Sequence, residues 1–412
     1  MFDSLMMRLV KTGRVAVIYP DGTKKAYGTP PQNNASPEVT MRLHRKDTAR
    51  KIMAKPYLAF GEAYMDGDLT IEGGTLWDLL DIIGRNLDDL PAPPVWMKLW
   101  SRVLQVLDTR NNPAASRHNV AHHYDLSDEM YRTFLDSDRQ YSCAYFSRPG
   151  LSLEEAQAAK KRHLIAKLDL KDGQRVLDIG CGWGGLALEI AHAADVEVVG
   201  ITLSQEQLAV ARRRAETAGL ARRVRFELMD YRELTDSFDR IISVGMFEHV
   251  GPANYDTYFA KIRTLLADDG VALVHSIGRR GVKGGSNSWI RKYIFPGGYI
   301  PSLSQVTQST ERTPLWITDL EILRLHYAET LRAWRERFMA SREEMTRLYD
   351  ERFVRMWEFY LASCEMNFRH GDLMVFQMQM AKRIDAVPLS RDYMFERERA
   401  LNHPPLSVAR RA

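Results

Sequence analysis

A glycine-rich turn in the middle of the chain is the first segment whose residue types could bind a ligand. The sequence VLDIGCGWGG, residues 176–185, places Asp178 at the end of an apolar run and just before Gly180 and Gly182. Glycines let a backbone approach a ligand closely, and the N-terminus of a following helix favours an anionic group. Because Gly180, Gly182 and Gly185 also satisfy G-x-G-x-x-G, a dinucleotide-binding dehydrogenase is one interpretation of this turn.

The ends of the next two strands distinguish this interpretation from another. A dinucleotide site needs an acidic residue about 20 residues further on, but GITLSQEQ, residues 200–207, has none at the strand's tip. Asp178 could instead engage a cationic ligand, and the pattern resembles the first motif of class I S-adenosylmethionine-dependent methyltransferases. In that case Asp230, in ELMDYREL, could accept from the adenine amino group, and Tyr231 could stack on the ring. The alternative for Asp230 is an ordinary helix N-cap.

The elements around these residues predict an α/β fold. Five apolar, β-branched runs occupy residues 175–180, 196–203, 224–230, 238–247 and 270–278. Helical patterns separate them, as at residues 204–219 and 254–268, and this alternation is typical of a doubly wound parallel sheet. The expected fold class is therefore α/β, a class I methyltransferase Rossmann-like doubly wound sheet with a smaller α+β N-terminal domain.

A proline-rich segment divides the chain. The sequence DDLPAPPVW, from Asp88, has three prolines in four residues, which ends a helix and favours a linker. We place the boundary near residue 109. This gives an N-terminal domain of residues 1–109, for contact with lipid or membrane or for dimerisation, and a catalytic domain of residues 110–412.

The N-terminus combines apolar and basic residues at helical spacing. Phe2, Met6 and Leu9 share one face, and Arg8 and Lys11 lie between and after them. Such a segment suits an anionic membrane surface. A short helix packed on its own domain is the alternative.

The composition argues against several classes of protein. A formal net charge of +4, from 57 basic and 53 acidic residues, gives no argument for nucleic acid. Three cysteines without a His/Cys cluster indicate neither a disulfide framework nor a metal site. No apolar run is long enough to span a bilayer. We therefore expect a cytoplasmic protein that is neither secreted nor integral to a membrane.

Several longer motifs occur together in one order. They include HNVAHHYDLSDEMYRTFLDSDRQYSCAYF, the glycine-rich turn, GMFEHVGPANYDTYF, IFPGGYIPS, HYAETLRAW and RMWEFYLASCEMNFR. This series resembles the cyclopropane-fatty-acyl-phospholipid synthase family over residues 110–385. The resemblance implies that an acyl-chain alkene attacks the sulfonium methyl of S-adenosylmethionine, giving a carbocation that loses a proton and closes to a ring. A carbocation requires an apolar, aromatic-rich and dry pocket.

The resemblance also implies roles for individual residues. A bound bicarbonate is the base, and the groups that hold it are Cys143, Glu248, His275, the backbone of Ile277, and Tyr327. The residues implied to contact S-adenosylmethionine are Tyr141, Ser142, Asp178, Gly180, Gly182, Thr202, Leu203, Gln207, Asp230 and Tyr231. Candidate aromatic walls for the acyl chain are Tyr145, Phe247, Tyr293, Phe295, Tyr299, Tyr327, Trp334 and Phe359. Cys364, on an apolar helical stripe, is a further nucleophile candidate.

Some of these residues have simpler interpretations. Cys143 could be a nucleophile or a small buried hydrophobe instead of a wall of the anion site. Glu248 and His275 follow strands whose ends meet at a ligand crevice, but each could be a satisfied polar residue at a strand end. Tyr327 and Cys364 could both be core residues, and Cys181 fits the glycine turn as a small residue.

The implied partner is a phospholipid bilayer surface with unsaturated acyl chains. Basic residues in the insertion at residues 279–302 suit anionic headgroups, so we expect peripheral association with the inner membrane surface. A homodimer is implied by the resemblance alone, and no nucleic acid is expected. The alternatives are a same-family enzyme that makes methyl-branched or methylene fatty acids, a small-amine N-methyltransferase, and a non-catalytic lipid-binding protein.

Overall fold

The computed structural model describes residues 2–29, 38–87, 128–281 and 287–402. The chain forms two compact units, each built from separate segments. Unit 1 contains Met1–Gln105, Lys283–Pro296 and Tyr327–Leu373, and unit 2 contains Val106–Val282, Gly297–His326 and Met374–Ala412.

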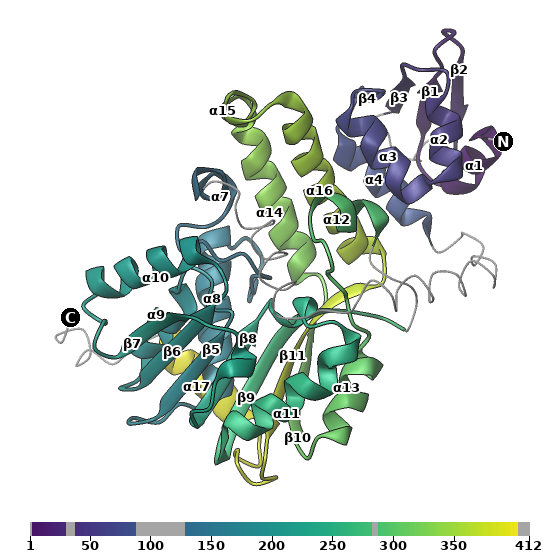
Figure 1. Ribbon diagram of the computed structural model, residues 1–412. Coiled ribbons are helices and arrows are strands. Elements are labelled where there is room, and N and C mark those ends of the chain that lie inside the picture. The colour runs from purple at the N-terminus through teal and green to yellow at the C-terminus, as the bar shows by residue number, and fades with distance from the viewer. Residues whose placement is uncertain (1, 30–37, 88–127, 282–286, 403–412) are drawn as a thin grey trace. The chain divides into compact units, whose positions relative to one another are not determined.

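A seven-stranded sheet forms the centre of unit 2 (Figure 1). Its strands are β5 (Arg175–Ile179), β6 (Glu197–Thr202), β7 (Val224–Leu228), β8 (Phe238–Val244), β9 (Leu266–Arg279), β10 (Trp316–Leu323) and β11 (Leu373–Ala381), in the order β10-β11-β9-β8-β5-β6-β7. The pairs β5–β6, β6–β7, β5–β8 and β8–β9 are parallel, whereas β10 and β11 are antiparallel. All five predicted strands are confirmed, and the antiparallel pair at one edge was not predicted.

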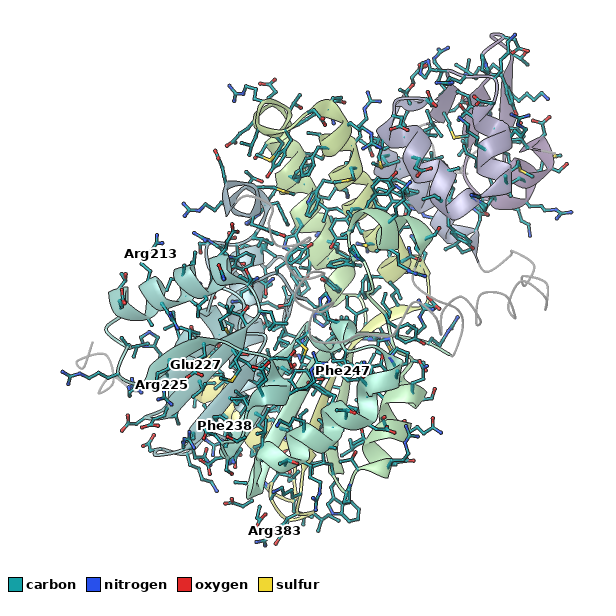
Figure 2. All side chains as sticks on the ribbon, viewed as in Figure 1. Arg213, Arg225, Glu227, Phe238, Phe247 and Arg383 are labelled. Carbon is teal, nitrogen blue, oxygen red and sulfur yellow. The ribbon has the colours of Figure 1, made fainter. Side chains whose placement is uncertain are left out.

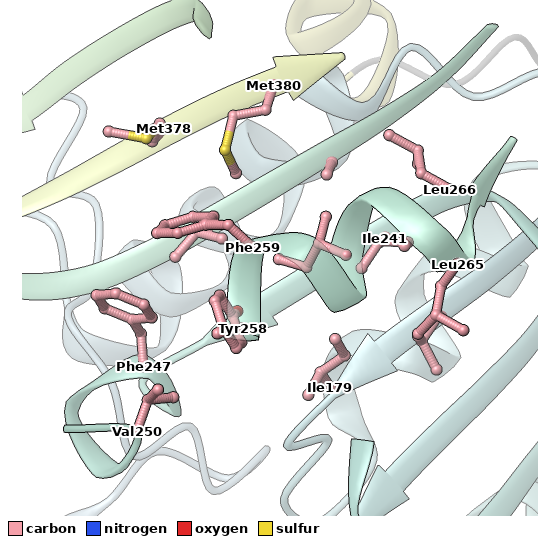
Figure 3. Packing of buried hydrophobic residues seen from close by; sticks show 14 of the residues in the cluster. Ile179, Ile241, Phe247, Val250, Tyr258, Phe259, Leu265, Leu266, Met378 and Met380 are labelled. Atoms are coloured by element: carbon pink, nitrogen blue, oxygen red, sulfur yellow. The ribbon is translucent and has the colours of Figure 1, made fainter. Parts of the chain in front are cut away.

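Helices cover both faces of this sheet. The long helices of unit 2 are α8 (Leu153–Leu168), α9 (Gly185–Ala193), α10 (Gln205–Thr217), α11 (Tyr255–Leu265), α13 (Leu303–Arg312) and α17 (Asp392–Asn402), with the shorter α7 (Asp128–Phe134) before them. Neighbouring strand residues point to opposite faces, so Ile241 belongs to one apolar cluster and Ile242 to the other. Figure 3 shows the first cluster, where Tyr258 and Phe259 of α11 pack against the sheet. Coverage of both faces is what a buried parallel sheet requires.

Charged residues lie around the rim of this unit. Figure 2 shows the labelled arginines Arg213, Arg225 and Arg383 at its periphery, with Phe238 and Phe247 inside. The two phenylalanines are almost completely buried.

Unit 1 has a four-stranded sheet in the order β2-β1-β3-β4. The strands are β1 (Val15–Ile18), β2 (Lys24–Tyr27), β3 (Val39–Leu43) and β4 (Leu69–Glu72), and the helices are α1 (Phe2–Leu9), α2 (Thr48–Ala54), α3 (Pro56–Met65), α4 (Leu76–Arg85), α12 (Ser288–Tyr293), α14 (His326–Ala340), α15 (Arg342–Leu348) and α16 (Glu351–His370). Strands β1 and β2 form an antiparallel hairpin, with Gly22 at positive φ in its turn.

Residues far apart in sequence make the core of unit 1. Helix α16 packs on α3 and α4, and Tyr64 donates a buried hydrogen bond to Glu358 at 2.7 Å. The sequence interpretation assigned α12 and α14–α16 to the catalytic half without foreseeing this packing. The proline-rich linker and the proposed boundary near residue 109 lie outside the described residues, so the division into 1–109 and 110–412 stays a prediction.

The N-terminal helix α1 is packed on its own unit. Phe2, Met6 and Val10 are buried, and the Phe2 ring contacts the edge of Tyr19 at a centroid distance of 6.3 Å. The apolar face that could have entered a membrane is therefore covered by protein. Within the described residues, no helix is long and apolar enough to cross a membrane.

The core cluster around α11 gives a first test of the fold. Phe259 is completely buried, so Phe259→Ala should lower the free energy of unfolding by about 3–5 kcal/mol through lost burial and the cavity left behind. Phe395→Ala makes the same change at a half-exposed site on α17 and should cost less than about 0.5 kcal/mol. Urea unfolding measures both. Equal effects of the two substitutions would contradict the packing described here.

Candidate active site

One cavity opens at the carboxyl ends of the parallel strands in unit 2. The loops after β5, β6, β7 and β8 line it together with residues 139–142. Its lining includes all ten residues predicted to contact S-adenosylmethionine: Tyr141, Ser142, Asp178, Gly180, Gly182, Thr202, Leu203, Gln207, Asp230 and Tyr231. The structure thus brings these residues together, as expected for a crevice at the carboxyl ends of parallel strands.

The glycine turn leaves space for a ligand. Gly180 and Gly182 have φ of 81° and 54°, which glycine adopts without steric cost. A Cβ atom at Gly182 would meet no described atom within 4 Å, so the space above the turn is open. The N–H groups of Gly180 and Cys181 both donate to the carbonyl of Ile201, at 2.9 and 3.0 Å, and fix the turn on β6.

Asp178 lies beneath this turn with half of its carboxyl unsatisfied. The side chain is buried, and its Oδ2 has no hydrogen-bond partner among the described residues. Burial raises the pKa of Asp178 to about 7, although the nearby charge of Lys160 opposes the rise. A buried, unpaired acceptor is costly, so this atom suits a cationic group such as an amine or a sulfonium.

The ends of β6 and β7 are held by local hydrogen bonds. Thr202 Oγ1 donates to Gln207 Oε1 at 2.9 Å, and Ser204 caps α10 by accepting from the Gln207 N–H. Asp230 accepts from the N–H of Arg232 at 3.0 Å and pairs with its guanidinium at 2.6–2.8 Å. The capping alternative for Asp230 is therefore what the structure shows, in a residue that also lines the cavity.

Helix α8 positions the segment that carries Tyr141 and Ser142. A capping box between Ser152 and Glu155 starts this helix. One turn later, Gln157 Nε2 donates to the carbonyl of Ser142 at 2.9 Å, and Lys160 Nζ donates to the Ser142 hydroxyl at 2.9 Å. Lys160 also bonds to Gln140, and burial lowers its pKa to about 8. The sequence interpretation missed these two α8 residues, because a lysine within a helix is usually solvent-exposed.

A second group of predicted residues is centred on Glu248. The N–H of Ile277 donates to Glu248 Oε1 at 2.7 Å, while Glu248 Oε2 is buried without a partner among the described residues. Burial raises the pKa of Glu248 to about 7. The Ile277 N–H already donates to Glu248. It could therefore also donate to a bound anion only if its proton were shared between the anion and the Glu248 carboxyl. The neighbours Met246 and His249 line the cavity itself.

His275 and Cys143 are the other predicted residues of unit 2. His275 is buried in β9, and its Nδ1 lies 3.2 Å from Nε2 of Gln377. Burial lowers the pKa of His275 well below its usual value, and the charges of Lys160 and Lys167 add to this effect. The Cys143 thiol is buried and lies 3.4 Å from the carbonyl oxygen of Ala144.

Tyr327 and Cys364 belong to unit 1. The Tyr327 ring packs on Phe368 and on the edge of Trp334, at centroid distances of 4.7 and 5.8 Å. Burial raises the pKa of the Cys364 thiol to about 12, which disfavours a nucleophilic thiolate. The structure does not place either residue relative to the cavity, and their catalytic roles stay predictions.

Other lining residues were not predicted. They are Arg139, Gln140, Ile179, Cys181, Trp183, Leu186, Ile201, Met229, Arg232, Val244, Gly245, Met246, His249, Val250 and Asn254. Most lie within a few residues of a predicted one, so proximity in sequence to the strand ends was the available signal. His249 was not predicted to contact S-adenosylmethionine, but it follows β8 beside Glu248 at the strand end where the sequence places the crevice, and burial lowers its pKa to about 4.

Comparisons with known proteins agree with this geometry. Residues 111–378 match the family described as mycolic acid cyclopropane synthetase, and residues 1–90 match a domain of unknown function. The chain is 40% identical over 359 residues to the cyclopropane-fatty-acyl-phospholipid synthase of Escherichia coli (strain K12), covering 85% of this chain and 90% of that protein. It is 36% identical over 395 residues to the tuberculostearic acid methyltransferase UfaA1 of Mycobacterium tuberculosis (strain ATCC 25618 / H37Rv), covering 92% and 90%.

A solved structure of the same family also aligns with this chain. The mycolic acid cyclopropane synthase CmaA1, complexed with SAH and CTAB, superposes with a TM-score of 0.61 at 35% identity. The alignment covers 64% of this chain and 97% of that one.

The order of the sheet, with a glycine turn and a buried acid at its centre, is that of a class I S-adenosylmethionine-dependent methyltransferase. Its methyl donor is S-adenosylmethionine, and the dinucleotide interpretation is set aside. Within this class the chain belongs to the cyclopropane-fatty-acyl-phospholipid synthase family, as its motifs predicted.

The raised pKa of Asp178 predicts pH-dependent binding of S-adenosylmethionine. A cationic ligand beside Asp178 competes with one proton, so the dissociation constant should fall about fivefold from pH 6 to pH 7 for a carboxyl whose pKa is about 7. Isothermal titration calorimetry measures it. Asp178→Asn should bind more weakly and with no pH dependence in this range.

Asp195→Asn is the matched control, because its carboxylate is 79% exposed. This variant should keep the wild-type affinity and the wild-type slope. A flat wild-type profile, or a slope that survives in Asp178→Asn, would show that Asp178 does not face the cation.

Proposed function

We propose that this protein transfers a methylene group from S-adenosylmethionine to the cis double bond of unsaturated phospholipid acyl chains, forming a cyclopropane ring. The observation that carries the proposal is the buried Glu248 carboxyl. The Ile277 N–H holds one of its oxygens, the other has no partner among the described residues, and Met246 and His249 of the same segment line the cavity. Cyclopropanation must remove a proton from the transferred methyl group, so the site needs a base and a group that holds this base.

The cavity residues would orient the methyl donor. When bound, S-adenosylmethionine supplies an electrophilic methyl group. Asp178 would hold the cationic part of the ligand, and the open space at Gly182 would admit it closely. Asp230 and Tyr231 would hold the adenine, for which the Asp230 pair with Arg232 must adjust.

A bicarbonate ion would complete the site. When bound, bicarbonate supplies a small base for the proton that leaves the new methyl group. Glu248 would hold it either as a donor or as an acceptor, because a carboxyl with a pKa of about 7 populates both forms near neutral pH. We include Cys143, His275 and the backbone of Ile277 in this site, and the roles of Tyr327 and Cys364, which belong to unit 1, stay predictions.

The residues around this proposed base exclude water. Cys143, His275 and Ser276 are almost completely buried, and dryness protects a carbocation from capture by water. Phe247, a candidate aromatic wall for the acyl chain, belongs instead to the core cluster. Its ring stacks on Tyr255 at a centroid distance of 4.5 Å and faces the protein interior (Figure 3).

Access to an acyl chain requires contact with a lipid surface. We propose that the protein is cytoplasmic and associates peripherally with the inner membrane surface. The basic insertion supports it only partly, since Lys292 pairs with Glu62 at 2.7 Å and Lys283 lies outside the described residues. We also retain a homodimer and a catalytic domain of residues 110–412 as proposals.

The product distinguishes cyclopropanation from methyl branching. Protein, methyl-labelled S-adenosylmethionine and vesicles of cis-unsaturated phospholipid should give acyl chains heavier by one methylene, with no alkene left to hydrogenate, as read by mass spectrometry. Saturated vesicles are the control and should gain nothing. A gain that leaves a reducible alkene would favour a methylene or methyl-branched product, and no gain would overturn the proposal.

Glu248 and bicarbonate can be tested together. In bicarbonate-depleted buffer, turnover should fall and recover on addition of bicarbonate. Glu248→Gln should lower kcat about 100-fold, within the range typical of groups that assist proton transfer, while the dissociation constant for S-adenosylmethionine changes less than about twofold. Wild-type turnover that ignores bicarbonate would overturn this part of the proposal.

A further inference from the structure

We propose that Lys167 and Gln377 fix the tautomer of His275, holding it as a neutral imidazole with its proton on Nε2. Both would be positioning residues, acting through His275 and not on the substrate. The inference rests on the proposed function only for the role of His275 at the anion, because the tautomer follows from the hydrogen-bond chain and can be measured separately.

The chain begins at Lys167 on α8. Its Nζ donates to Gln377 Oε1 at 2.7 Å, and an ammonium group can only donate. This contact determines which way the Gln377 amide points, because the carbonyl oxygen must face the lysine. The NH2 group of the same amide must then face the other way.

That NH2 group faces His275. Gln377 Nε2 lies 3.2 Å from His275 Nδ1, so Nδ1 must accept. A ring nitrogen that accepts carries a lone pair and no proton. The proton of the neutral imidazole is therefore on Nε2.

Lys167 is held in turn by a carboxylate. Glu321 on β10 lies opposite Gln377 in the strand ladder and forms an ion pair with Lys167. Glu321 also bonds to His163 Nε2 at 2.7 Å, and His163 Nδ1 lies 3.0 Å from Glu398. Burial raises the pKa of Glu321, but its bonds to His163 and Lys167 lower it to about 2. The carboxylate is thus charged at neutral pH and keeps Lys167 in place.

The charges that face His275 keep it neutral. Burial has the largest effect on its pKa, and the positive charges of Lys160, Lys167 and His163 lower it further, while Glu321 raises it. Unlike a carboxylate, the neutral Gln377 amide adds no charge that would stabilise an imidazolium. His275 is thereby a hydrogen-bond donor through Nε2 and not a general base. The proton that leaves the substrate must therefore go to another acceptor.

The test is nitrogen NMR of protein labelled with 15N in its histidine rings. The His275 signals are those that disappear in His275→Gln. In the wild type they should show a neutral ring protonated at Nε2 throughout pH 6–8. A neutral ring protonated at Nδ1, or an imidazolium at pH 7, would overturn the proposal whatever the reaction proves to be.

Substitutions at Gln377 give the second readout. Gln377→Glu places a carboxylate at Nδ1, so the ring should become an imidazolium or move its proton to Nδ1, and kcat should fall about 10- to 100-fold, as is typical when the partner of a functional histidine is lost. Gln379→Glu is the matched control, because Gln379 is equally buried on the same strand but bonds to Tyr393 and the Lys167 carbonyl. It should leave the His275 signals unchanged.

Lys167→Met keeps the inference testable if Gln377→Glu does not fold. Without the ammonium group, either end of the Gln377 amide can face His275, and the NMR spectrum should show both tautomers. A single Nε2-protonated ring in this variant would refute the part assigned to Lys167. Failure of the proposed function would appear separately, as wild-type protein that adds no mass to cis-unsaturated acyl chains.

Discussion

The burial of ionisable groups away from water at the carboxyl edge of the parallel sheet is the constraint on which the site depends. It drives ionisable groups toward their neutral forms: burial raises the pKa of Asp178 and Glu248 to about 7 and lowers that of His249 to about 4. Asp178 and Glu248 also each keep one carboxyl oxygen without a partner among the described residues. Such an edge is costly when empty, and a ligand that brings charge and hydrogen bonds relieves the cost. The same dryness would protect a carbocation.

Helix α8 is the element that supports this edge of the sheet. Gln157, Lys160, His163 and Lys167 follow one another at intervals of three or four residues, so they share one face of the helix, and all four are buried. Toward the N-terminal end of this stripe, Gln157 and Lys160 hold the segment that carries Ser142. Toward the other end, Lys167 supports the contact between Gln377 and His275. One helix face thus supports both the proposed cofactor wall and the proposed anion site.

Local signals explain what could be predicted from the sequence. Runs of apolar residues predict the five strands, and glycines close together in sequence predict the turn. Both signals lie within ten residues of each other, so Asp178 and Gly180 could be placed together. Glu248 and His275 follow from their positions at strand ends. The α8 stripe could not be found in this way, because AQAAKKRHLIAKL has the charges of a solvent-exposed helix. The contacts of Lys167 with Glu321 and Gln377, 154 and 210 residues away, depend on the pairing of β10 with β11, which was not predicted.

The choice of an amide instead of a carboxylate beside His275 has a chemical reason. A carboxylate at Nδ1 would raise the basicity of the ring and favour imidazolium, whose charge would oppose both a sulfonium ligand and a developing carbocation nearby. A neutral ring of the other tautomer would leave a lone pair on Nε2, a nucleophile that could be methylated. An amide whose orientation is set by Lys167 avoids both outcomes, because Nε2 keeps its proton and the ring stays uncharged. The charges that orient the amide belong to the buried Lys167–Glu321 pair. This pair lies on the far side of Gln377, so its charges orient the amide without contacting the histidine.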